Sequence, residues 1–144
     1  HSSVIRETVR LLRSPAFKGP LDEYQKSIEA YTHHHFKEAV RESSNAFEST
    51  LKVLLKLSSI SYESSDTASR LIKKLIDGGF LPSKLETFSN ALSQIMTSGL
   101  PTIANPVRHG QGEEVSEIED HYASFALHLS GSYIIFLIRL YEQK

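Results

Sequence analysis

Apolar side chains recur three or four residues apart along almost the whole chain, and this spacing constrains the fold more than any other feature. It is the spacing of one face of an α-helix, whereas the alternation typical of a half-buried strand is rare. Glycine and proline stand between the periodic segments, where they end helices. The chain has 144 residues, an ordinary size for one domain. We therefore expect residues 1–144 to form a single all-α bundle of five or six helices with a long final helix.

Local signals divide this pattern into segments. Residues 83–86 and 116–119 fit capping boxes, and Asp66 or Ser65 can cap a helix that ends at Gly78-Gly79. Gly19-Pro20 marks a turn after which Pro20 can start a helix. The expected helices cover residues 4–12, 21–57 with a break at 31–35, and 117–142. Between the last two lie the capped helix that carries Leu71 to Ile76 and a helix that opens at residues 83–86 and carries Leu85 to Met96.

The last expected helix is apolar on every side over residues 133–138. This run is too short to cross a bilayer, which needs about 20 residues, so we expect no membrane. A helix that is apolar all round is buried on more than one side, and an isologous pair would bury the second side. The sequence thus predicts a homodimer. The expected core stripe of this helix consists of Tyr122, Phe125, Ala126, Leu129, Tyr133, Phe136, Leu137 and Leu140.

Composition excludes several classes of site. The chain has no cysteine, which rules out disulfides, thiolate metal sites, iron–sulfur clusters and a cysteine nucleophile. The net charge of −1 means that nucleic-acid binding needs a local basic patch. The three residues 33–35 are all histidines, but on a helix they would point about 100° apart, so we expect no metal and no cofactor. We expect no signal peptide, because the chain does not open with a basic segment followed by an apolar one, and we expect a cytoplasmic location. Because the chain begins with His1, a longer parent protein is also expected.

Residues 99–112 lack clear periodicity and carry the side chains best suited to chemistry. Histidine titrates near neutral pH and can act as acid or base, which suits His109. Arg108 beside it could hold a phosphate through two hydrogen bonds. Gly110 and Gly112 let the backbone turn tightly. The alternative is a helix-linking loop with a solvated arginine and an exposed histidine.

This segment, together with residues 42–52, resembles the HEPN superfamily, and most closely the C-terminal domain of abortive-infection proteins. The resemblance lies in Asn105, in His109 and in the Gly110-Gln111-Gly112 that follows. It implies an all-helical, usually dimeric, metal-independent ribonuclease from a toxin–antitoxin or antiphage system. The implied partners are substrate RNA, a second copy of the chain, and an antitoxin or an upstream sensor domain.

The resemblance also implies a role for each residue of the motif. The family signature is an arginine followed by a polar residue and then a histidine, with four to six residues between the arginine and the histidine. His109 would transfer the proton, with Asn105 as the polar neighbour, but position 104, where the arginine is expected, is Ala104. Either Ala104 replaces an arginine of the natural protein, or the protein is naturally a non-catalytic dimerisation or RNA-binding module. The residues expected to contact substrate are Arg108, Gly110, Gln111 and Gly112.

Supporting residues come from two expected helices. Glu42, Asn45 and Glu48 are three residues apart and project from one helix face, from which they could orient His109 or Arg108. His121 lies near the start of the last helix and could reach the cleft that we expect His109 to face. For all four residues the alternative is an ordinary solvated surface. A further alternative for the whole chain is an unrelated helical adaptor whose last helix packs on a partner.

Overall fold

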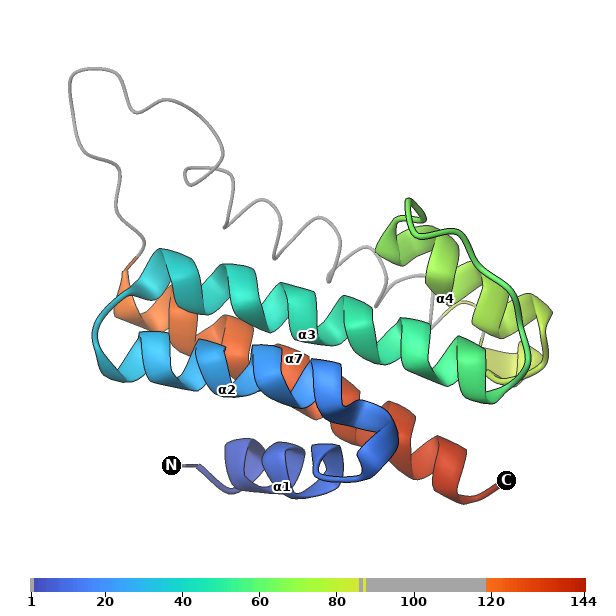
Figure 1. The fold of residues 1–144 in the computed structure, drawn as a ribbon, viewed down its shortest axis with the longest axis horizontal. Coiled ribbons are helices and arrows are strands. Elements are labelled where there is room, and N and C mark those ends of the chain that lie inside the picture. Colours follow the sequence, from blue (N-terminus) through green and yellow to red (C-terminus); the bar gives the residue numbers. More distant parts are fainter. Residues whose placement is uncertain (1, 86, 88–118) are drawn as a thin grey trace.

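The computed structural model describes residues 2–85, 87 and 119–144, and within them every element is helical (Figure 1). The described residues contain no strand, which confirms the expected all-α fold. The helices are α1 (Ser3–Leu12), α2 (Lys18–Thr32), α3 (Phe36–Leu57), α4 (Ala68–Asp77) and α7 (Asp120–Glu142), with short 3-10 turns at Pro15–Phe17 and Ser83–Leu85.

The long helices α2, α3 and α7 form the body of the bundle. α2 and α3 run side by side, α7 packs against both, and α1 lies against α7 (Figure 1). α4 packs on the C-terminal part of α3. One hydrophobic core joins these elements, with Leu12, Tyr24, Leu51, Leu75 and Ile134 almost fully buried.

The first two helices begin and end for local reasons. Ser2 caps α1, because its hydroxyl accepts a hydrogen bond from the Ile5 amide at 3.2 Å. α1 then ends at Leu12, shortly before Pro15, as expected. α2 begins at Lys18, so the expectation that Gly19-Pro20 forms a turn before the helix is wrong. Pro20 lies instead in the first helical turn, where its missing N–H has no partner to lose.

The break between α2 and α3 falls at residues 33–35, inside the predicted range. His34 has a φ of 62°, a left-handed conformation that reverses the chain between the two helices. The His35 amide donates to the Ala30 carbonyl at 2.8 Å. The buried Ser27 hydroxyl donates to the Ala39 carbonyl at 2.7 Å, which ties α2 to α3 just beyond the turn.

α4 is capped by a different residue from those expected. The Thr67 hydroxyl accepts from the Arg70 amide at 3.3 Å, which makes Thr67 the N-cap. Asp66 is buried, and it accepts from the Glu63 amide at 2.9 Å and forms an ion pair with Lys74. The predicted end of this helix is confirmed, since Gly78 is its C-cap and Gly79 has a φ of 82°.

α7 differs from the sequence-based expectation in two respects. It begins at Asp120 with Glu119 as its N-cap, so the capping box at residues 116–119 does not start this helix. Its buried stripe is also rotated, because Tyr122 is 47% exposed and Phe125 is 49% exposed. The residues that α7 does bury include several small ones, and they are Ala123, Ala126, Leu127, Ser130, Gly131, Tyr133, Ile134, Leu137 and Ile138.

Small residues let α7 approach three neighbours, α1, α2 and α3. These neighbours cover more than one side of α7, so its all-round apolar character does not by itself require a second copy of the chain. By length and composition α7 is also apolar enough to cross a membrane, but half of its most apolar stretch is buried inside the bundle. The core helix of a helical bundle has the same properties.

Candidate functional site

The residues expected to carry catalysis and substrate contact fall outside the part of the chain that the structure describes. The structure does describe the helices that carry the expected supporting residues, namely α3 and the start of α7. The expected residues outside it are Ala104, Asn105, Arg108, His109, Gly110, Gln111 and Gly112.

The supporting residues on α3 share one face, as their spacing predicts. The Asn45 side-chain amide donates to Glu42 Oε1 at 3.2 Å. This bond fixes both side chains on one turn of α3, and it leaves the second carboxylate oxygen of Glu42 able to accept a proton or a hydrogen bond. Glu48 follows on the next turn and lines a cavity together with Asn45.

That cavity is a small polar hollow of about 180 Å³ between α2 and α3. α2 contributes Glu23, and α3 contributes Asn45, Glu48, Ser49 and Lys52. Glu23 could not be identified from the sequence, because only the pairing of α2 with α3 brings it to this face.

The Glu23 carboxyl of this hollow has a raised pKa. Burial raises its pKa, a hydrogen bond from Ser49 opposes that effect, and the nearby charges of Glu42, Asp22 and Glu48 raise the pKa further. Glu23 Oε1 is buried and has no hydrogen-bond partner among the described residues. A carboxyl in such surroundings holds its proton to a higher pH than an exposed glutamate.

His121 stands apart from the α3 face. It is exposed in the first turn of α7, where its Nδ1 lies 3.5 Å from Glu119 Oε2 and its ring lies 4.5 Å from the Tyr122 ring. Both contacts are to residues at its own end of α7. Its predicted role at a cleft therefore remains a prediction.

The start of α7 is tied to the end of α2 by a contact that the sequence did not indicate. The Tyr31 hydroxyl donates a hydrogen bond to Asp120 Oδ1, and the Tyr31 ring packs on Phe36 with 5.5 Å between ring centroids. The chain therefore enters α7 beside the turn that joins α2 to α3.

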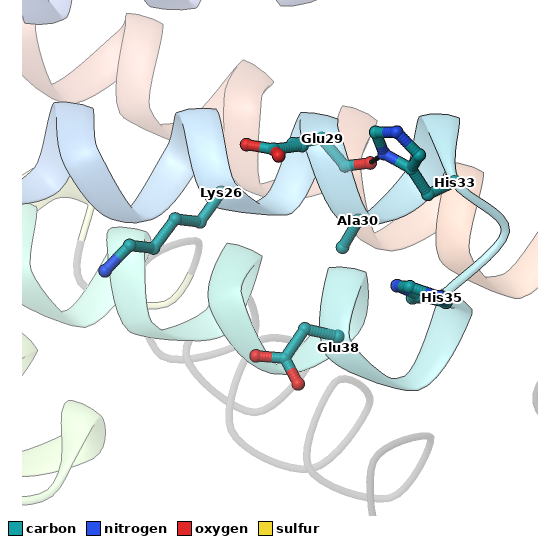
Figure 2. A pocket seen from close by; sticks show the side chains of 6 residues that line it. All are labelled: Lys26, Glu29, Ala30, His33, His35 and Glu38. Atoms are coloured by element: carbon teal, nitrogen blue, oxygen red, sulfur yellow. Dashed lines mark hydrogen bonds between the residues drawn. The ribbon is translucent and has the colours of Figure 1, made fainter.

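The turn between α2 and α3 carries a second, larger cavity of about 430 Å³. Figure 2 shows the residues that line it, with Lys26, Glu29 and Ala30 on α2, Glu38 on α3, and two histidines at the end where the helices are joined. The cavity therefore carries acidic and basic side chains together. The histidines are His33 and His35.

The three histidines lie in the turn between α2 and α3 and not on a helix, so the angle of about 100° between successive helical residues does not apply to them. His33 and His35 line the same cavity, and their ring centroids are 6.3 Å apart. His33 Nδ1 lies 2.9 Å from the Glu29 carbonyl oxygen, to which it can donate. In residues 2–85, 87 and 119–144, however, no three histidine, aspartate or glutamate side chains are placed to hold a metal ion.

The sequence of this bundle matches a protein-family model over most of its length. The Abi_C family, described as a HEPN-like domain, matches residues 18–141. The chain belongs to this family. The match runs from the start of α2 almost to the end of α7, so it includes the α3 polar face and residues 104–112 of this Abi_C domain, whereas α1 precedes it. No curated protein and no solved structure matches the chain.

Proposed function

We propose that this Abi_C domain is a metal-independent endoribonuclease of a bacterial abortive-infection or toxin–antitoxin system. In the present chain Ala104 stands where the resemblance expects the catalytic arginine. The observation that carries the proposal is the HEPN-like family match over residues 18–141, which includes the Asn105-to-His109 motif.

The chemistry follows from the residue types. In RNA, the 2′-hydroxyl loses its proton and attacks the adjacent phosphorus, the bond to the 5′-oxygen breaks, and that oxygen takes a proton from water. The products carry a 2′,3′-cyclic phosphate and a 5′-hydroxyl. His109 takes the proton of the 2′-hydroxyl, and an arginine at position 104 stabilises the charge that grows on the phosphorane oxygens. DNA has no 2′-hydroxyl and resists cleavage.

The described face of α3 supports this assignment. Asn45 fixes the Glu42 carboxylate at 3.2 Å, and a fixed carboxylate can hold the imidazole of a general base in one orientation. In this proposal Glu42 positions His109, and Glu48 contributes negative charge on the same face.

A non-catalytic RNA-binding and dimerisation module is the second candidate, and Ala104 is the observation that favours it. For either candidate we propose a homodimer in the cytoplasm, in which the half-exposed Tyr122 and Phe125 lie at the contact between copies. An antitoxin or a sensor domain would act as the regulatory partner.

Restoring the arginine separates the two candidates. The Ala104→Arg chain is expected to cleave single-stranded RNA in the presence of EDTA and to be toxic on expression. Adding His109→Ala to it should reduce cleavage by about 10²–10⁴-fold. No cleavage and no toxicity with Ala104→Arg would favour the binding module, and cleavage that persists without His109 would refute its role as the base.

A further inference from the structure

The N-terminal segment carries a charge opposite to that of the rest of the chain. Residues 1–18 contain four of the sixteen basic residues, Arg6, Arg10, Arg13 and Lys18, and only Glu7 of the seventeen acidic ones. The segment therefore has a net charge of +3, whereas residues 19–144 have a net charge of −4. All of α1 precedes the family match, which begins at residue 18.

α1 is nevertheless an integral part of the folded bundle (Figure 1). Leu11 and Leu12 are buried in the common core. The Ser2 hydroxyl lies 2.9 Å from His128 Nε2 on α7, and Arg139 of α7 donates to Glu7 at 2.9 Å. The arginines of α1 are therefore presented on a fixed element.

Two arginines of α1 and Arg13, the residue that caps its C-terminus, line one groove. A cavity of about 270 Å³ lies between α1 and α2, lined by Ile5, Arg6, Val9, Arg10, Arg13 and Ile28. The arginines are at positions i, i+4 and i+7, so they follow one helix face over about 10 Å. The isoleucines and the valine give the groove an apolar floor.

The positive charge of this groove is only partly neutralised at Arg10 and Arg13. Glu7 pairs with Arg139 as well as with Arg10, so its single negative charge is shared between two cations. The Arg10 side chain stays 66% exposed, and an exposed pair of this kind contributes little energy. Arg13 forms no ion pair with any described residue.

We propose that the groove between α1 and α2 binds single-stranded RNA, an inference that rests on RNA being the ligand of the proposed function. Guanidinium groups bind phosphates through two parallel hydrogen bonds. An unpaired base can lie on the apolar floor against the planar arginine heads, which is how single strands are commonly held. An acidic amphipathic helix fits less well, because it needs an apolar groove that spans several helical turns.

Binding of a labelled, unstructured RNA to the chain as it stands, followed by fluorescence anisotropy, tests the proposal. The variant Arg6→Gln/Arg10→Gln/Arg13→Gln, called the α1 variant below, is expected to bind RNA at least roughly tenfold more weakly in low salt. The slope of the logarithm of its binding constant against the logarithm of the salt concentration should become shallower by about 2. The matched control Arg70→Gln/Lys73→Gln/Lys84→Gln removes the same charge from exposed positions on and after α4 and should bind like the parent chain.

Several results would overturn the proposal. Equal losses of RNA affinity in the two triple variants would show that only the total charge of the protein matters. Unchanged RNA binding by the α1 variant would show that the RNA binds outside this groove. Competition by polyglutamate as effective as that by unlabelled RNA would assign the groove to an acidic protein. If the α1 variant does not fold, as judged by circular dichroism, Arg13→Gln alone must still weaken binding for the proposal to survive.

The binding test is independent of catalysis. If the Ala104→Arg chain cleaves RNA and the α1 variant loses no RNA affinity, RNA binding by the groove is refuted and the proposed function is retained. If the α1 variant loses RNA affinity but the Ala104→Arg chain does not cleave RNA, the proposed ribonuclease activity is refuted and RNA binding by the groove is retained.

Discussion

The Tyr24 hydroxyl on α2 lies where a side chain at position 131 of α7 would stand. A Cβ atom built on Gly131 would be 2.6 Å from the Tyr24 oxygen and 2.8 Å from Thr8 Oγ1. Gly131 thus lets three helices meet at one point, since Thr8 belongs to α1. At the same point the Tyr24 hydroxyl donates to the Leu127 carbonyl at 2.9 Å.

Gly131→Ala should therefore destabilise the domain even though alanine favours helices. Overpacking of this kind costs about 1–3 kcal/mol, which outweighs a gain in helix propensity of about 1 kcal/mol. Urea denaturation measures the free energy of unfolding. Gly19→Ala is the control, because a Cβ there meets nothing within 4 Å, and this variant should be neutral or stabilised. A stabilised Gly131→Ala would contradict the close contact.

Two buried tyrosines should respond in opposite ways to loss of their hydroxyls. Tyr24→Phe removes the hydrogen bond to Leu127 and should cost about 1 kcal/mol. The Tyr133 hydroxyl is buried with no hydrogen-bond partner among the described residues, so Tyr133→Phe should be neutral or slightly stabilising. The difference between their free energies of unfolding is the test, and equal losses would show that Tyr133 does have a partner.

Asp66 should stabilise the folded domain at neutral pH and lose this stabilising effect at acidic pH. The ion pair with Lys74 and the hydrogen bond from the Glu63 amide lower the pKa of Asp66. A lowered pKa in the folded state gives stability that is present above the unfolded value of about 3.9 and is lost as the pH falls below it. Asp66→Asn should therefore destabilise the domain at pH 7 but much less at pH values below the lowered pKa. If Asp66→Asn lowers the free energy of unfolding by the same amount at both pH values, the ionised carboxylate of Asp66 is not the source of the stability.

Ionisation of Glu23 should have the opposite effect on stability from ionisation of Asp66. Its raised pKa means that ionisation costs stability as the pH rises through the folded-state value. Glu23→Gln keeps the shape and should raise the thermal midpoint at pH 7 while leaving it almost unchanged at pH 4. Glu38→Gln, at an exposed carboxylate of α3 that pairs with Arg41 and is not among the charges acting on Glu23, is the control and should not show this pattern. An effect of Glu23→Gln that does not depend on pH would mean that the carboxyl is not the cause.

Local signals predicted much of this fold, and tertiary contacts decided the rest. The turn at residues 33–35 and the end of α4 at Gly78 were predictable because turns and C-caps depend on nearby residues. The buried face of α7 was not, because its sequence is apolar on all sides and only the close approach at Gly131 selects the side that packs. In the same way spacing predicted the Glu42–Asn45 face, whereas Glu23 joins it only through the pairing of α2 with α3.

The pair Glu42–Asn45 should matter for cleavage rather than for folding. In the Ala104→Arg chain, Asn45→Ala frees the Glu42 carboxylate from its 3.2 Å hydrogen bond. If that carboxylate positions His109, kcat should fall roughly 10- to 100-fold, because a small misplacement of a general base is costly. The pH–rate profile should shift as well, since the imidazole loses an oriented negative partner.

Glu38→Gln on the same helix removes an exposed carboxylate that pairs with Arg41, and it should leave both kcat and the profile unchanged. If Asn45→Ala cleaves RNA like the Glu38→Gln control, the polar face of α3 is an ordinary solvated surface and Glu42 does not act on His109.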